Sequence, residues 1–193
     1  IAQSEACNDK EFAHYWMHNG FLNINNVKMS KSLGNFFTVR EIAEKYDLQV
    51  LRFFMLSAHY RSPLNFSADL MEASKNGLER IVNAAENLKF RMKNAKEEAI
   101  TEAEQEAYAK TEEFVGKFEA AMDDDFNTAD AVAAVFDLVK YINTNTSEES
   151  SAEYLKKLLE RLTKLCDVLG LIVDKEEEML AEDIEKMIEE RQA

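Results

Sequence analysis

The sequence predicts a mostly α protein in which a small α+β segment with a strand hairpin precedes an antiparallel helical bundle. Its 193 residues include only five Gly and one Pro, so few residues interrupt helices. Ala, Glu, Leu, Lys and Met dominate the second half, where apolar residues recur at helical spacing. An all-β fold is therefore disfavoured, and a hydrophobic content of 46% is enough to fill a core.

Charge is distributed unevenly along the chain. Residues 1–66 contain seven Lys and Arg against six Asp and Glu, whereas residues 67–193 contain sixteen against thirty-one. The net charge of -14 therefore belongs to the second part. Because binding to phosphates requires clustered Lys and Arg, the chain as a whole is not expected to bind a nucleic acid. We expect two parts, divided between residues 66 and 67.

Turn signals organise the beginning of the chain. Residues 1–8 have a helix-like pattern. Asn19-Gly20 stands between apolar runs and predicts a hairpin turn, with strands over Ala13–His18 and Phe21–Ile24. A second turn at Asn25-Asn26 leads the chain away from the second strand. The segment that follows is expected to leave a strand end as a loop.

Capping signals then introduce two helices. Thr38 and Glu41 have the spacing of a capping box, which predicts a short helix. Asp47 is expected to cap the next helix, which covers Leu48–His59. Since that segment is apolar on most sides, we expect it to be buried between neighbours.

Long amphipathic helices fill the second part. Ser67 can cap a helix that continues to about Ala95. Gly170 is the expected C-terminal cap of the last long helix. Further helices are predicted over residues 102–122, 128–143 and 152–169, with a short charged helical segment over residues 175–190. Their number and polar connections are typical of a helical bundle.

Cysteine usage and hydropathy indicate a soluble, cytoplasmic protein without membrane contact. Cys7 and Cys166 are far apart and form no CxxC pair. The sequence has no secretory signal and no run of about eighteen apolar residues. The first residue is Ile1 and not Met, so we expect the chain to be part of a longer protein. An apolar face exposed by such truncation would favour self-association.

The most informative segment is Lys28-Met29-Ser30-Lys31-Ser32, which is followed by Leu33-Gly34-Asn35. Two ammonium groups three residues apart, two hydroxyls and backbone donors on a loop suit the charge that develops on a departing pyrophosphate. The alternative is an ordinary exposed Lys/Ser loop, which the strand-turn context disfavours. The five letters match the KMSKS signature of class I aminoacyl-tRNA synthetases without a substitution.

Flanking segments narrow this resemblance. Four stretches, which together span essentially the whole chain, resemble the cysteinyl-tRNA synthetase family of bacterial type: IAQSEACND, YWMHNGFLNINNVKMSKSLGNFFTVREI, LRFFMLSAHYRSPLNFS and AMDDDFNTADA. The resemblance implies that residues 1–66 are the carboxy-terminal end of the class I catalytic region, with the KMSKS loop. Residues 67–193 would then be a DALR-type helical bundle without the full anticodon-side domain.

The resemblance also implies roles for single residues. Lys31 would contact ATP and stabilise the adenylation transition state, with Lys28 as the second catalytic residue. Lys28, Ser30 and Ser32 would also bind the ATP phosphates, although the family resemblance supports these three assignments less strongly than that of Lys31. The implied partners of the full-length enzyme are ATP, cysteine and tRNA(Cys). The nucleotide signature and the zinc ligands of the family lie upstream of Ile1, so this chain is expected to carry no metal ligand and to be inactive alone.

Other candidate residues favour structural roles. Cys7 and His14 are suitable types for zinc, but a site needs about four ligands, and Cys7 lacks a base that would make it a nucleophile. The triplet Asp123-Asp124-Asp125 resembles a magnesium site, yet the N-cap types Asn127 and Thr128 follow it, which favours a helix boundary.

The segment His59-Tyr60-Arg61 closes the apolar helix beside Ser62-Pro63. We expect it to form a joint between the loop region and the bundle. The functional alternative is that Arg61 or His59 touches the tRNA acceptor arm or steadies the KMSKS loop.

Two further functions remain open from the sequence. The cysteine ligase of mycothiol synthesis resembles the cysteinyl synthetases and uses an amino-sugar acceptor, although the stretch MDDDFNT favours a synthetase. A non-catalytic helical module would bind a protein partner through its acidic bundle. An intact KMSKS signature argues against that second alternative.

Overall fold

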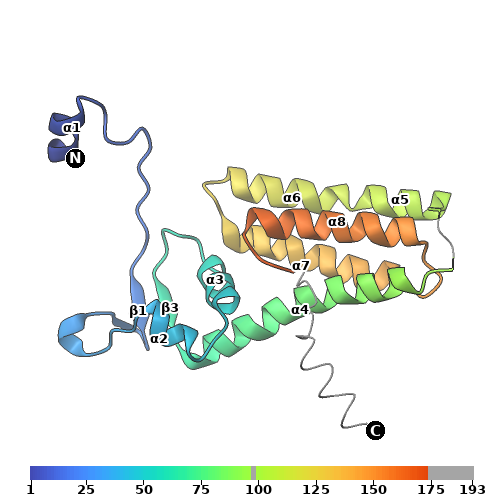
Figure 1. Ribbon diagram of the computed structural model, residues 1–193, viewed down its shortest axis with the longest axis horizontal. Coiled ribbons are helices and arrows are strands. Elements are labelled where there is room, and N and C mark those ends of the chain that lie inside the picture. The colour runs from blue at the N-terminus through green and yellow to red at the C-terminus, as the bar shows by residue number, and fades with distance from the viewer. Residues whose placement is uncertain (97–98, 174–193) are drawn as a thin grey trace, which may run out of the picture.

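The computed structural model describes residues 1–96 and 99–173. A small three-stranded sheet and short helices lie at one end of a bundle of long helices (Figure 1). This arrangement confirms the predicted fold class, a mostly helical protein with a small α+β segment. The helical segment expected over residues 175–190 lies outside the described residues.

The sheet has the order β2-β1-β3. Strand β1 (Leu22–Ile24) pairs antiparallel with β2 (Val27–Lys28) and parallel with β3 (Leu64–Phe66). Asn25 and Asn26 form the hairpin turn with φ of 49° and 64°. Asn tolerates this left-handed conformation, which two-residue hairpin turns require. The predicted turn at Asn25-Asn26 is therefore confirmed.

The first predicted strand and turn are wrong. Residues 13–18 form no strand, and the Tyr15 side chain is 92% exposed. Gly20 makes no hairpin turn; its N–H donates to the carbonyl of Tyr60 at 2.7 Å. A Cβ on Gly20 would lie 2.3 Å from the carbonyl oxygen of Ser62. The glycine is thus required by a close approach of two backbones, a role that the hairpin interpretation missed.

The first part of the chain also contains three short helices, and α1 lies apart from the sheet (Figure 1). Helix α1 (Ala2–Asn8) has no buried residue. The predicted capping box opens α2 (Val39–Ala43), and the Asp47 side chain caps α3 (Leu48–Leu56) by accepting a hydrogen bond from the Gln49 N–H at 2.8 Å. Both caps are confirmed, and α3 ends three residues earlier than predicted. As expected, α3 contributes to the core, with buried side chains at Val50, Phe53 and Phe54. It is not buried on all sides, because Leu48 and Met55 are each 50% exposed.

Long helices form the bundle: α4 (Ala68–Lys93), α5 (Glu102–Lys110), α6 (Glu112–Asp123), α7 (Thr128–Asn145) and α8 (Ala152–Val168). The predicted helix over residues 102–122 is interrupted at Thr111, which is fully buried. Its hydroxyl donates to the Tyr108 carbonyl at 2.6 Å and accepts from Arg161 at 2.6 Å. The Thr111 side chain thus hydrogen-bonds to the backbone and to a distant arginine, and such bonds compete with the regular helix. The spacing of apolar residues gives no sign of this competition.

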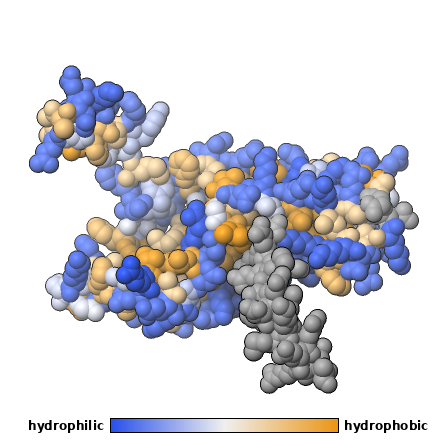
Figure 2. All heavy atoms as spheres, viewed as in Figure 1, coloured by the Kyte–Doolittle hydropathy of each residue, from blue (hydrophilic) through white to orange (hydrophobic). Residues whose placement is uncertain are grey.

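The core lies between α4, α7 and α8, with α3 packed against α4 and α7. Several of its side chains are completely inaccessible to solvent: Met71, Ile81, Val135, Leu138, Leu158 and Leu162. Within residues 1–96 and 99–173, no helix combines the length and apolarity that a membrane crossing needs. Figure 2 shows hydrophilic residues over most of the visible bundle surface, in keeping with the acidic charge of this part.

Gly170 ends α8 and packs against α3. It follows the cap residue Leu169 with φ 65°, which confirms the predicted glycine end of this helix. The Nε of Arg52 donates to the Leu169 carbonyl at 2.7 Å. A Cβ on Gly170 would lie 2.4 Å from the Arg52 Nη2. The glycine therefore permits both the left-handed backbone and the close approach of the guanidinium.

Replacing Gly170 with Ala is expected to lower the free energy of unfolding by about 1–3 kcal/mol, because an L side chain is strained at this φ and displaces Arg52. Urea unfolding followed by circular dichroism measures the change. Gly116→Ala is the matched control, since this exposed position lies inside α6 with no atom within 4 Å of the added Cβ. That control should stabilise the chain by about 0.5–1 kcal/mol. A neutral Gly170→Ala would contradict the argument.

Candidate functional site

The KMSKS loop leaves the sheet at Lys28, the last residue of β2. Ser30 then caps a short 3-10 helix, η1 (Lys31–Leu33). Gly34 ends this helix with φ 66°, and its N–H donates to the Lys31 carbonyl at 3.3 Å. A glycine is suited to this left-handed end. The predicted loop at a strand end is therefore present, and it has a compact local structure.

The side chain of Asn35 closes the loop. Its Oδ1 accepts a hydrogen bond from the Ser30 N–H at 2.9 Å, and its Nδ2 donates to the Lys28 carbonyl at 3.3 Å. The hydroxyls of Ser30 and Ser32 lie 2.7 Å apart. The Met29 N–H donates to the Leu22 carbonyl at 3.2 Å, which ties the loop to β1. Asn35 was part of the motif segment, but sequence reasoning assigned it no role.

Both lysines of the loop are solvent-exposed and lie over aromatic rings. Lys28 Nζ is 4.2 Å from the centre of the Phe21 ring, and Lys31 Nζ is 5.4 Å from that of Phe36. At exposed sites such contacts contribute about 0.5–1 kcal/mol. Among the described residues, neither lysine belongs to an ion pair. Both ammonium groups are therefore available to an anion.

Asn35→Ala is expected to loosen the loop, because the replacement leaves the Ser30 N–H and the Lys28 carbonyl without their partner. Two neutral hydrogen bonds correspond to about 1–3 kcal/mol, or roughly a ten- to hundredfold faster exchange of the Ser30 amide. Hydrogen exchange measured by NMR gives this rate. Asn35→Asp is the matched control, since it keeps the acceptor for Ser30. A Ser30 amide in Asn35→Ala that exchanges as slowly as in the wild type would show that Asn35 does not hold the loop.

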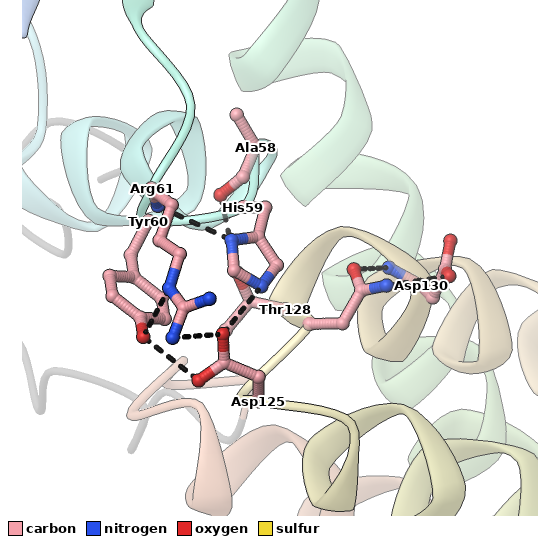
Figure 3. A network of polar contacts seen from close by, with 8 residues as sticks. Ala58, His59, Tyr60, Arg61, Asp125, Thr128 and Asp130 are labelled. Carbon is pink, nitrogen blue, oxygen red and sulfur yellow. Dashed lines mark hydrogen bonds and ion pairs between the residues drawn. The ribbon is translucent and has the colours of Figure 1, made fainter. Parts of the chain in front are cut away.

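A second polar cluster joins the sheet segment to the bundle. Figure 3 shows the carboxylate of Asp125, which follows α6, facing three consecutive side chains after α3. Tyr60 Oη donates to Asp125 Oδ1 at 2.8 Å, Arg61 Nη2 lies 3.0 Å from Oδ2, and His59 Nε2 lies 3.7 Å from Oδ2. The Arg61 Nε also donates to Tyr60 Oη at 3.0 Å. The predicted joint at His59-Tyr60-Arg61 is thus present.

Backbone geometry explains how Asp125 reaches this cluster. Helix α6 ends at Asp123, and Asn127 caps α7 by accepting a hydrogen bond from the Asp130 N–H at 3.2 Å, so the predicted helix boundary is confirmed. Between them, Asp125 and Phe126 both have a positive φ, 56° and 54°. Sequence reasoning missed the contacts of Asp125, because its partners are more than sixty residues away.

The candidate metal and nucleophile residues do not converge. Cys7 is exposed, and His14 Nδ1 lies 3.2 Å from the Glu11 carboxylate in an exposed pair. In the part of the chain that the structure describes, no group of three or more His, Cys, Asp or Glu is placed to hold a metal ion. Burial raises the pKa of the Cys166 thiol to about 12, so this cysteine stays protonated and unreactive.

Comparison with known proteins places the loop and the bundle in one family. The model of the tRNA synthetases class I (C) catalytic domain matches residues 1–76, and the DALR domain model matches residues 117–173. The chain is 60% identical over 192 residues to a cysteine-tRNA ligase of Lachnospira eligens, covering 100% of this chain and 41% of that protein.

Two further cysteine-tRNA ligases are similar. Identity is 54% over 198 residues with the protein of Lachnoclostridium phytofermentans, covering 100% of this chain and 42% of the relative. Identity is 52% over 191 residues with the cysteine-tRNA ligase of Clostridioides difficile, covering 99% of this chain and 41% of the relative. The chain therefore spans about two fifths of the length of these relatives.

A solved structure has a similar fold. It is the agnB2 LeuRS of Agrobacterium radiobacter K84 in a ternary complex with tRNA and LeuAMS, with a TM-score of 0.65 and 21% identity over 79% of this chain and 20% of that one. At this identity the likeness concerns the fold alone. The two family models and the three ligases carry the assignment: the chain belongs to the cysteine-tRNA ligase family of class I aminoacyl-tRNA synthetases.

Proposed function

We propose that this chain forms part of an enzyme that activates cysteine with ATP and transfers it to tRNA(Cys). The observation that carries the proposal is the intact KMSKS loop, with both lysines exposed and unpaired among the described residues, on a chain 60% identical to a cysteine-tRNA ligase. The proposed division assigns residues 1–66 to the end of the catalytic region and residues 67–193 to the DALR-type bundle.

In the proposed reaction, the carboxylate of cysteine attacks the α-phosphorus of ATP, and the bond to pyrophosphate breaks. Negative charge increases on the departing phosphates, and Lys31 would stabilise it more strongly in the transition state than in bound ATP. Lys28 and the hydroxyls of Ser30 and Ser32 would contribute further contacts to the phosphates. The terminal ribose hydroxyl of tRNA then attacks the cysteinyl-adenylate and releases AMP.

The remaining catalytic groups would come from the part of the enzyme outside this chain. The described residues offer no ligand set for the zinc of the family, so in the proposed reaction these residues hold no metal ion. The need for ATP and tRNA supports a cytoplasmic location. Exposed aromatic side chains near the start of the chain, such as Tyr15 and Trp16, support self-association of the isolated chain.

The test is ATP-pyrophosphate exchange by the full-length enzyme that carries this chain. Exchange should depend on cysteine and should not occur with serine or alanine, which lack the thiol. Labelled cysteine should then become attached to tRNA(Cys) and remain unattached to an amino sugar. Exchange with another amino acid, or transfer to the amino sugar alone, would contradict the proposal.

A further inference from the structure

Asp125 holds its carboxylate against the sheet segment at a conformational cost. Its φ of 56° lies in the left-handed region, which is unfavourable for most non-glycine residues, although Asp tolerates it better than most and helix ends often adopt it. In return the carboxylate meets Tyr60, Arg61 and His59 together (Figure 3). The hydrogen bond to Tyr60 and, less strongly, the charge of Asp125 raise the pKa of the Arg61 guanidinium.

These contacts add little to the stability of the fold. The side chains of Arg61 and Asp125 are 66% and 37% exposed, and solvent-exposed ion pairs of this kind contribute little to folding. Apolar packing already attaches α3 to the bundle: Phe53 meets Phe136 of α7 edge to face, with ring centres 6.1 Å apart. The cluster therefore contributes more to the orientation of the α6-α7 turn relative to residues 59–61 than to the stability of the fold.

The backbone at Tyr60 connects this cluster to the loop. The Tyr60 carbonyl accepts a hydrogen bond from the Gly20 N–H at 2.7 Å, two residues before β1. Next to it, the Leu64 N–H donates to the Phe21 carbonyl at 2.9 Å and begins the pairing of β3 with β1. The Tyr60 backbone therefore contacts the chain directly before β1.

From β1 the contacts continue into the KMSKS loop. β1 pairs with β2, and the Met29 N–H donates to the Leu22 carbonyl at 3.2 Å. Asn35 then closes the loop on Ser30 and Lys28. Hydrogen bonds joined by short stretches of the chain thus connect the α6-α7 corner of the bundle with the loop that carries Lys31.

We propose that Asp125 is a positioning residue for the KMSKS loop, because it fixes the orientation of the bundle relative to the sheet that carries Lys31. The inference rests on the proposed function and extends it: the bundle takes part in adenylation through orientation and touches no substrate. A tilt at the joint would move Lys31 away from the phosphates, and a displacement of about 1 Å can cost up to roughly a hundredfold in rate.

The test compares variants of the full-length enzyme in cysteine-dependent ATP-pyrophosphate exchange, with rates normalised to titrated active sites. Asp125→Asn keeps a residue that tolerates the left-handed backbone but removes the charge, and Tyr60→Phe removes only the hydroxyl. Each should lower kcat about tenfold and leave KM for cysteine unchanged. The double variant should be no worse than the more impaired single variant, because both changes break one connection. Asp124→Asn, an exposed neighbour, should match the wild type.

Hydrogen exchange gives a second measurement that does not depend on activity. The amides of Gly20 and Met29 should exchange faster in Asp125→Asn than in the wild type, while amides in the middle of α7 keep their protection. A purely structural role would instead lower the melting temperature and the fraction of active sites, with kcat per site unchanged, and would overturn the inference.

The possible failures are distinguishable. An inactive wild-type enzyme would refute the proposed function, and the exchange of the Gly20 and Met29 amides would still decide the inference. An active wild type with normal kcat in Asp125→Asn and Tyr60→Phe would refute the positioning role alone.

Discussion

Lys31→Ala in the full-length enzyme is expected to lower kcat for cysteine-dependent ATP-pyrophosphate exchange by about 10²–10³-fold, the usual loss when one preorganised electrostatic partner of a transition state is removed. The physical reason is that charge on the leaving pyrophosphate increases as its bond to the α-phosphorus breaks. KM for cysteine should stay close to its wild-type value, because the lysine faces phosphate oxygens in the proposed complex.

Lys45→Ala is the matched control for this prediction. Lys45 is an exposed lysine shortly after α2 and lies outside the KMSKS loop. Its substitution by Ala therefore removes the same charge from the chain without affecting the loop. Its kcat should equal that of the wild type. If both lysine variants kept wild-type activity, Lys31 would have no catalytic role, whereas an equal loss in both would indicate a general effect of net charge.

Leu158→Ala should produce the largest loss of stability, about 2–5 kcal/mol in the free energy of unfolding. Leu158 is 0% exposed in α8, the helix that packs against α4, α5 and α7. The substitution removes buried methyl groups and leaves a cavity that surrounding helices fill only in part. Urea unfolding of this chain, followed by circular dichroism, measures the midpoint and slope.

Leu70→Ala provides the comparison on a solvent-facing site. Leu70 lies in α4 and is 43% exposed, so the same substitution removes less apolar contact and creates no enclosed cavity. Its cost should stay within about 1 kcal/mol. Similar losses at Leu70 and Leu158 would contradict the placement of the core between these helices.

Local signals predicted most helices, because they depend on residues within one or two turns. Thr38 with Glu41, Asp47, Ser67 and Asn127 cap helices where the sequence placed a helix start. Each cap is a hydrogen bond between near neighbours, so the residue types that form it stand together in a short stretch of sequence. The same holds for the turn at Asn25-Asn26, whose two residues tolerate the required backbone.

Features that depend on distant partners were missed. Leu64–Phe66 is too short to show strand periodicity and becomes β3 only because β1 lies beside it. Gly20 has the appearance of a turn residue, yet its position is set by the backbone of Ser62. The interruption at Thr111 depends on Arg161, fifty residues away. These contacts form only in the folded chain, so no local sequence pattern predicts them.

The sequence by itself determined the KMSKS loop, the caps and the helical bundle, since each depends on residue types at short spacing. Tertiary structure alone decided that Asp125 meets Tyr60 and Arg61 across the joint. A hydrogen bond forms only when both groups are brought within about 3 Å in a suitable direction. For groups far apart in the chain, the packing of the helices and the sheet supplies that proximity.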